Sequence, residues 1–532
     1  MTDTGLIEAM TRPDFYPNHP DTVELLQTHI SFIFIAGEEV YKLKKAVDFG
    51  FLDFTTLEKR KFYYNEELRL NRRLAPDTYI EVLPISKDER GMFAFGEGKR
   101  IVEYAVRMKR LPAEKMLKVL LAKGLIKEDV MDDIAKKVAA FHKEAATGGR
   151  IDEIGGLETV RFNHKENFEQ TLPYVGFTIP RRQFDFIRDY VHHFLFSHAG
   201  LFKQRVANHK IRDCHGDLHL EHIVVDNGIT IFDCIEFNER LRFEDVAAEV
   251  AFLAMDLDYN GYPACGESFV HAYVRHADEP EVLQLLNFFK CYYAYVRGKV
   301  IGFRTRDDAI SEPLQQEAAR TAAGYFDLAY TYAARIEKPA LIITAGLIGS
   351  GKSVLARSLA NRLGAEIIQM DTLRKDLLGI SPTERHLEDF GKGIYSSNIS
   401  KNTYDEALRR AISLIQTGTS VIIDASFKKS TERLISAKAA HAAGVDFFIV
   451  ECACPDRIIG ERLKLRSADL NEPSDGRWDI FQAQKKDYET ITEFQWDIHF
   501  VIDTEKKLED STDEALRLIR HINQVDQADV MC

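Results

Sequence analysis

Eight consecutive residues, GLIGSGKS at 346–353, combine the residue types that bind nucleotide phosphates. Glycines let backbone N–H groups turn toward phosphate oxygens, because they adopt conformations that other residues avoid. Lys352 can reach the β- and γ-phosphates of a nucleotide, and the Ser353 hydroxyl can hold Mg²⁺. The sequence therefore predicts a Walker A loop, with nucleotide contacts from Gly346, Gly349, Ser350, Gly351, Lys352 and Ser353.

A second group of residues suited to phosphate chemistry surrounds a predicted hairpin. His215-Gly216-Asp217 comes before the hairpin, and Asp233 ends it. Between them the sequence indicates strands over 222–226 and 229–233, joined by an Asn-Gly turn. Phosphoryl transfer needs one carboxylate to orient or deprotonate the attacking hydroxyl and another to hold Mg²⁺. Two aspartates that flank one hairpin can reach the same cleft, so we expect both in one site.

Two lysines and two glutamates further upstream complete this group. Lys42 and Lys44 alternate along the segment VYKLKK, so they share one face of a strand and either can reach phosphates. Glu66 and Glu67 lie in the helical stretch NEELRLNRRL, from which one of them can pair with a lysine.

The phosphate-binding loop needs a strand before it and a helix after it. The apolar run at 340–345 leads into the loop, and residues 354–363 have leucines four apart, with Gly364 as a helix stop. Similar apolar runs follow at 365–370, 420–425, 446–453 and 497–503, separated by helical patterns. This alternation predicts a parallel sheet covered on both faces, with the first run as its central strand.

Residues 1–335 have a different pattern. Strand-like segments crowd the first part, and from about residue 113 the pattern is mostly helical apart from the hairpin. A small β-rich lobe followed by a larger helical lobe is a kinase-like outline. We therefore expect two domains, 1–335 and 338–532, because 532 residues are too many for one core and RIEKP resembles a linker.

The hairpin motifs are similar to those of a known family. HGDLH followed by IFDCIEF resembles the aminoglycoside phosphotransferase family of the protein-kinase-like superfamily. The order of motifs along the whole chain is similar to bacterial bifunctional proteins that join such a domain to a P-loop kinase domain. The resemblance implies a fold class of α/β and α+β in two domains: an aminoglycoside phosphotransferase-like fold, then a P-loop NTPase parallel-sheet kinase domain.

The family's roles transfer to matching positions of this sequence. Lys42 would bind the ATP phosphates and Glu67 would hold it, while Asp217 would be the catalytic carboxylate and Asp233 a Mg²⁺ ligand. The family's second metal ligand is an asparagine five residues after the catalytic aspartate, where this chain has His222. A histidine nitrogen is a poorer Mg²⁺ ligand than an oxygen. The family's Gly-rich loop before the lysine strand is also missing from the sequence.

The positions around the Walker A loop favour a small-molecule kinase. Asp371 follows the second strand and Arg374 lies three residues on, which resembles the gluconate-kinase, zeta-toxin and polynucleotide-kinase groups. There the aspartate acts as general base on the substrate hydroxyl and the arginine binds substrate. Asp424 ends the run at 420–425, where a carboxylate supports Mg²⁺.

Two arginines in DRIIGERLKLRS are candidates for a catalytic lid. Arg462 and Arg466 are four residues apart and share a helix face, from which they can neutralise charge during transfer. The alternative is that they form a solvated helix face.

The composition limits the partners and the cellular location that we expect for this chain. The formal net charge of -13 makes the chain a poor general binder of nucleic acid or membranes, although an RNA or DNA end stays open as an acceptor. The seven cysteines contain no C-x-x-C pair, and we expect no secretory signal or membrane span, so we predict a cytoplasmic protein.

The sequence thus predicts an enzyme that uses ATP and Mg²⁺ to phosphorylate a hydroxyl-bearing small molecule. Three alternatives remain at this stage. The first domain can be a degenerate nucleotide sensor for an active P-loop domain, as His222 suggests. The chain can also be an ATP-hydrolysing interaction protein. Finally, His215, His219 and His222 with Asp217 have a spacing that can bind zinc.

Overall fold

The structure of the protein is a computed structural model. It describes residues 3–98, 100–126, 129–307, 310–336, 338–381, 391–467 and 477–521, although the side chains of residues 466 and 467 are not described. The chain divides into two compact units. The N-terminal unit comprises Met1–Ile179 and Phe194–Ala329, and the C-terminal unit comprises Pro180–His193 and Tyr330–Cys532.

The division differs in position from the predicted boundary between residues 335 and 338. Pro180–His193 and the chain from Tyr330 onward group with the C-terminal unit because they pack against its last helix, α19 (Leu508–Ile519). Arg517 of that helix pairs with Asp189 at 2.7 Å, and the Tyr330 hydroxyl donates to Asp513.

The first part of the N-terminal unit is built on an antiparallel sheet. Its strand order is β1-β2-β3-β6-β4-β5, and helix α2 (Leu57–Asn71) packs against it. Alternation along β3 directs Tyr41 and Leu43 into an apolar core, and Lys42 and Lys44 to the opposite face, toward α2. The strands are β1 (Val23–Gln27), β2 (Ser31–Ala36), β3 (Glu39–Lys44), β4 (Tyr79–Lys87), β5 (Phe93–Phe95) and β6 (Ile101–Lys109).

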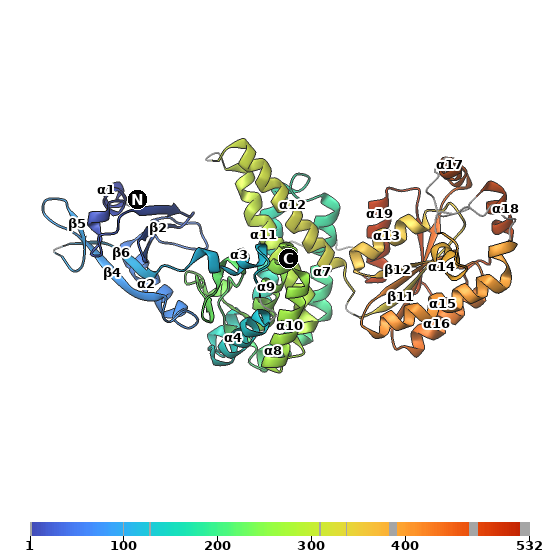
Figure 1. Ribbon diagram of the computed structural model, residues 1–532, viewed down its shortest axis with the longest axis horizontal. Coiled ribbons are helices and arrows are strands. Elements are labelled where there is room, and N and C mark those ends of the chain that lie inside the picture. The colour runs from blue at the N-terminus through green and yellow to red at the C-terminus, as the bar shows by residue number, and fades with distance from the viewer. Residues whose placement is uncertain are drawn as a thin grey trace. The chain divides into compact units, whose positions relative to one another are not determined.

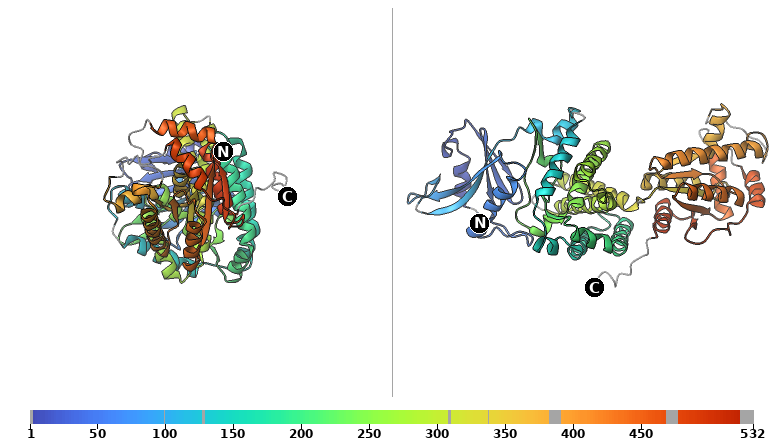
Figure 2. Two further views of the ribbon diagram at one scale, coloured as in Figure 1. Left: turned by 90° about the vertical axis from the view of Figure 1, so that its right-hand side faces the viewer. Right: turned by 90° about the horizontal axis from the view of Figure 1, so that it is seen from below.

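After β6 the N-terminal unit is mainly helical, and Figures 1 and 2 show these later helices to one side of the sheet. Two short antiparallel pairs lie among them, β7 (Ile211–Asp213) with β10 (Phe243–Asp245) and β8 (Ile223–Val225) with β9 (Ile229–Ile231). One helix, α1 (Thr4–Met10), comes before the sheet. The later helices are α3 (Leu117–Ala122), α4 (Val130–Glu144), α5 (Arg150–Ile154), α6 (Leu157–Thr171), α8 (Ala199–Ala207), α9 (Val246–Tyr259), α10 (Pro263–Ala277) and α11 (Val282–Phe303). Two further helices, α7 (Arg181–Ser197) and α12 (Glu312–Ala334), cross the division between the units.

The C-terminal unit is a parallel sheet of order β12-β13-β11-β14-β15, so the strand before the phosphate-binding loop is central, as predicted. Helices α13 and α19 lie on one side of it and α15 and α16 on the other (Figure 1). The strands are β11 (Ala340–Ala345), β12 (Glu366–Gln369), β13 (Val421–Asp424), β14 (Asp446–Ala453) and β15 (His499–Asp503). The other helices are α13 (Lys352–Leu363), α14 (Met370–Leu377), α15 (Ser397–Gln416), α16 (Ser430–Ala442), α17 (Asp456–Ser467) and α18 (Trp478–Asp487).

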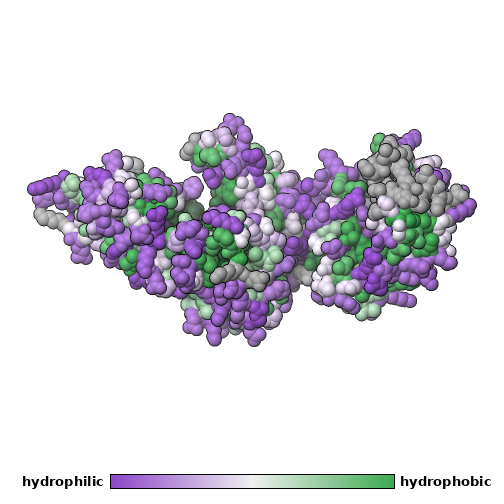
Figure 3. All heavy atoms as spheres, in the orientation of Figure 1, coloured by the Kyte–Doolittle hydropathy of each residue, from purple (hydrophilic) through white to green (hydrophobic). Residues whose placement is uncertain are grey.

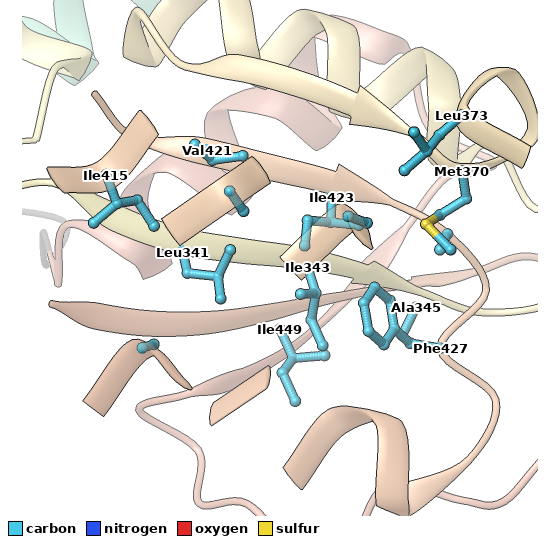
Figure 4. Close-up of a cluster of buried hydrophobic side chains, with 14 of the residues drawn as sticks. Leu341, Ile343, Ala345, Met370, Leu373, Ile415, Val421, Ile423, Phe427 and Ile449 are labelled. Carbon is cyan, nitrogen blue, oxygen red and sulfur yellow. The ribbon is translucent and has the colours of Figure 1, made fainter. Parts of the chain in front are cut away.

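One apolar core fixes the strands that carry the site. Side chains of β11, β13, β14 and α14 interlock on one face of the sheet (Figure 4). Leu341, Ile343, Val421, Ile423 and Ile449 are all at most 1% exposed. Burial on this scale favours a well-packed sheet, whose carboxyl edge then holds the loops that follow each strand. The predicted fold class is therefore confirmed: two domains, the second built on a parallel α/β sheet.

Two candidate nucleotide sites

The loop between β11 and α13 has a backbone that only glycine adopts readily. Gly346, Gly349 and Gly351 have φ values of 125°, 80° and 91°. A Cβ atom on Gly346 would also lie 2.7 Å from the Cys452 carbonyl oxygen, so a side chain does not fit there. The loop ends at the N-terminus of α13, where backbone N–H groups and the helix dipole favour an anion. This geometry is that of a phosphate-binding loop.

Oxygen donors meet beside this loop. Asp424, at the end of β13, accepts a hydrogen bond from the Ser353 hydroxyl. Thr344 of β11 donates to the Ala425 carbonyl at 2.9 Å and accepts from its N–H at 3.0 Å, which ties the two strands together. Burial raises the pKa of Asp424, and the Ser353 hydrogen bond and Lys352 charge offset this only in part. A hydroxyl and a carboxylate are the donors that Mg²⁺ prefers, so the residues fit this ion.

Asp371 lies in the first turn of α14, at the carboxyl edge of the sheet, and Arg374 lies three residues on, in the last turn of the same helix. Their side chains form an ion pair with an Nη1–Oδ1 distance of 2.8 Å. The Arg374 side chain is only 9% exposed and its guanidinium lies over the Tyr395 ring, whereas the Asp371 side chain is 42% exposed. A fixed arginine thus holds an accessible carboxylate in place.

Arg462 lies beside the phosphate-binding loop. It donates from Nη2 to the Thr504 carbonyl at 2.5 Å, and a Cβ atom on Gly351 would lie 3.2 Å from its Nη1. Thr504 in turn donates to the Ser350 carbonyl at 2.6 Å. The backbone of Arg466 is in α17, but its side chain lies outside the described residues.

Two loop contacts were missed from the sequence. Thr504 directly follows β15, at the sheet edge where open α/β sheets bind ligands, and this position was a usable signal. The Ile348 N–H donates to Gln484 Oε1 at 2.6 Å, and nothing in the sequence around Gln484 points to this contact.

In the N-terminal unit the structure distinguishes the two lysines of β3. Lys42 Nζ lies 2.5 Å from Asp233 Oδ1 and 2.9 Å from Glu67 Oε1. Lys44 pairs with Glu67 at 2.6 Å and with Glu236, and its side chain is fully buried. The Lys42 side chain is 12% exposed, so Lys42 is the one of these two lysines that can meet a ligand. Glu66 pairs instead with Arg69 near the surface.

The loop that carries Asp217 is held from beneath by one buried glutamate. Glu249 Oε1 accepts hydrogen bonds from the N–H groups of His215 at 2.6 Å and Gly216 at 2.7 Å. His142 Nε2 lies 2.7 Å from the other oxygen of Glu249. Burial lowers the pKa of His215 to about 4, so this ring is neutral and part of the support rather than a charge in the site.

His222 lies between the two aspartates. Its Nδ1 is 2.9 Å from the Asp217 carbonyl oxygen, and its Nε2 is 3.6 Å from Asp233 Oδ2. His219 Nε2 is 3.6 Å from Asp217 Oδ2. Burial raises the pKa of both aspartates, but the nearby cations and imidazoles lower it more, so both lie below the ordinary value. The structure thus brings Lys42, Glu67, Asp217, His222 and Asp233 into one site.

The two strands of the hairpin are shorter than predicted, and they leave out the two candidate site residues, His222 and Asp233. β8 begins at Ile223, and His222 belongs to a single 3₁₀ turn, Leu220–His222. β9 ends at Ile231, and Asp233 follows with a φ of 63°. The His222 N–H donates to the His219 carbonyl at 3.0 Å within this turn, while the His222 carbonyl still accepts from the Phe232 N–H at 3.1 Å. The Asp233 N–H donates to the Tyr79 hydroxyl oxygen at 3.2 Å. The turn also means that the three histidines do not share a helix face.

The comparisons with known proteins support part of this picture. Residues 341–491 match a family model described as an AAA domain. Uncharacterized proteins of Mycobacterium tuberculosis (strain H37Rv) and Mycobacterium bovis are each 29% identical over 512 residues, covering 94% of this chain and 97% of theirs.

Solved structures with similarity include a gluconokinase from Sinorhizobium meliloti, which is 20% identical with a TM-score of 0.26 and covers 35% of this chain and 94% of that chain. A choline/ethanolamine kinase family protein from Mesorhizobium loti is 14% identical with a TM-score of 0.37, covering 62% and 98%.

The loop geometry, the parallel sheet and the family match identify the C-terminal unit as a P-loop domain. Among the described residues, no helix is both long enough and apolar enough to span a bilayer. Hydrophilic residues cover most of the surface visible in Figure 3.

Proposed function

We propose that the protein is an ATP-dependent phosphotransferase with two nucleotide sites, each moving the γ-phosphoryl group of ATP to a hydroxyl of a small molecule. The observation that carries this proposal is the P-loop geometry with Asp371 beside it: a phosphate cradle, an oxygen-lined cation position and an accessible carboxylate at one sheet edge. Phosphoryl transfer is mainly positioning and charge neutralisation, and these parts supply both.

In the C-terminal unit, Asp371 would take the proton of the acceptor hydroxyl as its oxygen attacks the γ-phosphorus and the bond to ADP breaks. Arg374 orients that carboxylate through the 2.8 Å ion pair and binds the acceptor, and Arg462 neutralises charge on the transferring group. Arg466, four residues further on, would act with it. Ser353 and Asp424 would hold Mg²⁺, which neutralises the β- and γ-phosphate oxygens when bound.

In the N-terminal unit, Lys42 would bind ATP phosphates, positioned by Glu67, and Asp217 would accept the proton of a second acceptor hydroxyl. The lowered pKa of Asp217 keeps it ionised and able to orient a hydroxyl at neutral pH. Asp233 and His222 would hold a cation, although the imidazole is not the oxygen donor that Mg²⁺ prefers.

The experiment is ATP consumption with Mg²⁺ across aminoglycosides, sugars, nucleosides and short RNA or DNA ends. The wild type, Asp217→Asn and Lys352→Ala are compared. We expect at least one compound to stimulate turnover, and one of the two substitutions alone to remove that stimulation. If no compound stimulates turnover although both sites bind ATP, the phosphotransferase function is wrong.

A second candidate function is favoured by the ion pairs within the N-terminal site. Lys42 is bound to Asp233 at 2.5 Å, and His222 lies against both aspartates. Such a site suits a nucleotide sensor that regulates the P-loop domain. A phosphotransfer that Asp217→Asn abolishes and Lys352→Ala leaves intact would exclude it.

A further inference from the structure

The ring of His222 has two nitrogens with different surroundings. Nδ1 lies 2.9 Å from the backbone carbonyl oxygen of Asp217, which can only accept a hydrogen bond. The proton of the neutral ring is therefore on Nδ1, and Nε2 carries a lone pair. That lone pair faces Asp233 Oδ2 at 3.6 Å, so two electron-rich atoms point at one another.

This separation suits a cation between the two atoms. Two ligands that each lie about 2.1–2.2 Å from one metal ion are about 3.0–3.6 Å apart when they occupy neighbouring coordination positions. Lys42 pairs with the other carboxylate oxygen, Oδ1, which leaves Oδ2 of Asp233 for the ion.

His219 is less suited to be a ligand, although it is near. Its Nδ1 accepts a hydrogen bond from the Glu221 N–H at 3.3 Å, so its Nε2 carries the proton of the neutral ring. That N–H faces Asp217 Oδ2 at 3.6 Å. His219 thus serves as a matched control for His222 in the same loop.

The donor set differs from that of the P-loop site. Ser353 and Asp424 offer only oxygen, whereas His222 Nε2 and Asp233 Oδ2 offer one nitrogen and one oxygen. Mg²⁺ favours oxygen ligands and gives up its water reluctantly, while imidazole is a good ligand for first-row transition metals.

We propose that His222 Nε2 and Asp233 Oδ2 form a site that prefers a first-row transition-metal dication, such as Mn²⁺, to Mg²⁺. The chain would then use two cations of different chemistry in its two units. The proposal rests on the proposed function, because nucleotide phosphates and water complete the coordination of an ion held by only two protein atoms.

The test uses Mn²⁺ as the probe, in the full chain carrying Lys352→Ala so that the P-loop site contributes little. The chain is loaded with Mn²⁺ and a non-hydrolysable ATP analogue, and pulsed electron paramagnetic resonance measures ¹⁴N coupling to the metal. We expect a directly bound imidazole nitrogen in this chain. The coupling should disappear when His222→Asn is added and persist when His219→Asn is added.

Calorimetry on the same chains measures the preference of the site for Mn²⁺ over Mg²⁺. The ratio of Mg²⁺ to Mn²⁺ dissociation constants should fall by at least about tenfold with His222→Asn, because loss of a direct ligand should cost no less than the roughly tenfold lower limit for loss of an outer-shell partner. It should stay nearly constant with His219→Asn.

The possible outcomes distinguish failure of the N-terminal nucleotide site from failure of the metal preference alone. If the analogue does not bind to the Lys352→Ala chain, the N-terminal nucleotide site is wrong, and this metal site falls with it. If the analogue binds but the chain with native His222 shows no imidazole coupling, the metal preference alone is wrong. Because that measurement needs no substitution at His222, it decides the question even if His222→Asn does not fold.

Discussion

The two candidate phosphate sites are built in different ways. The P-loop site is built from the backbone of eight consecutive residues, and three positive-φ glycines shape it. The N-terminal site is built from side chains, and its lysine and aspartate, Lys42 and Asp233, are 191 positions apart. A backbone site depends on a short local conformation, whereas a side-chain site depends on the whole fold that brings its members together.

The cations of the two sites also have different partners. Lys352 and Arg462 each donate to a backbone carbonyl, at 2.8 Å and 2.5 Å. Lys42 and Lys44 are instead held by the carboxylates of Glu67, Asp233 and Glu236. Removing one member of a buried ion pair leaves an uncompensated charge, which costs more than one hydrogen bond. The N-terminal site should therefore be more sensitive to a single charge deletion.

The largest expected effect is that of Glu67→Ala. The substitution removes the carboxylate that two lysines share, so the N-terminal unit should lose about 3–5 kcal/mol of stability. Urea unfolding followed by a probe in this unit measures the loss. Glu66→Ala is the control, because its pair with Arg69 is near the surface and should contribute less than about 1 kcal/mol. Equal losses would show that the shared pair is not a stabilising centre.

Lys352→Ala should come next, and act on binding rather than on folding. Loss of one cation at the phosphates should weaken nucleotide binding by the C-terminal unit by roughly 10²–10³-fold, or reduce turnover to that extent. Titration with a fluorescent ATP analogue measures it. Arg357→Ala, an exposed position on the same helix, should have little effect. Loss of all nucleotide binding in Lys352→Ala would mean that only one site exists.

The same contrast explains which features of the two sites could be predicted from the sequence. The Walker A residues, the central strand and the position of Asp424 were predictable, because each depends on local spacing and on the order of parallel strands. Gly364 was identifiable as the end of α13 for the same reason, and it has a φ of 66°.

The details of the side-chain site were not predictable to the same depth. Strand alternation placed Lys42 and Lys44 on one face but could not tell which is buried, since that depends on Glu236 in a distant loop. The hairpin pattern extended strands through His222 and Asp233, because strand propensity does not register the 3₁₀ turn that ends at His222 or the positive φ of Asp233.

A third prediction tests whether the side-chain site also depends on its backbone. A Cβ on Gly346 would lie 2.7 Å from the Cys452 carbonyl oxygen, and one on Gly216 would lie 2.6 Å from the Leu241 carbonyl oxygen. Both have positive φ, so each substitution by alanine should cost about 1–3 kcal/mol from collision beyond its conformational cost. Thermal unfolding measures the change in each unit.

Two open positions serve as controls for that prediction. Gly418 and Gly261 also have positive φ, but a Cβ there would have nothing within 4 Å. Alanine at these positions should show the conformational cost alone. If Gly216→Ala were as mild as Gly261→Ala, the backbone of the Asp217 loop would be adjustable, and the N-terminal site would depend on its side chains only.

The smallest expected effect is the weakening of nucleotide binding at acid pH. Burial raises the pKa of Asp424, whereas for Asp233 the charge of Lys42 and the His222 ring outweigh burial and lower the pKa. As pH falls toward the ordinary aspartate value of about 3.9, Asp424 therefore takes up a proton first. With His222→Asn present in the N-terminal measurement, so that no imidazole titrates at the cation, Mg²⁺-nucleotide binding should weaken at a higher pH in the C-terminal unit than in the N-terminal unit, by no more than about tenfold per pH unit.

Lys42→Ala and Lys352→Ala separate the two binding curves, since each leaves one site to titrate. Asp424→Asn should flatten the acid limb of the C-terminal curve, because the substituted side chain no longer takes up a proton. A C-terminal curve that keeps its acid limb in Asp424→Asn would place the titrating group elsewhere. Coincident acid limbs in the two units would show that the oxygen-lined site and the lysine-paired site hold their carboxylates at the same pKa, against the contrast in their partners.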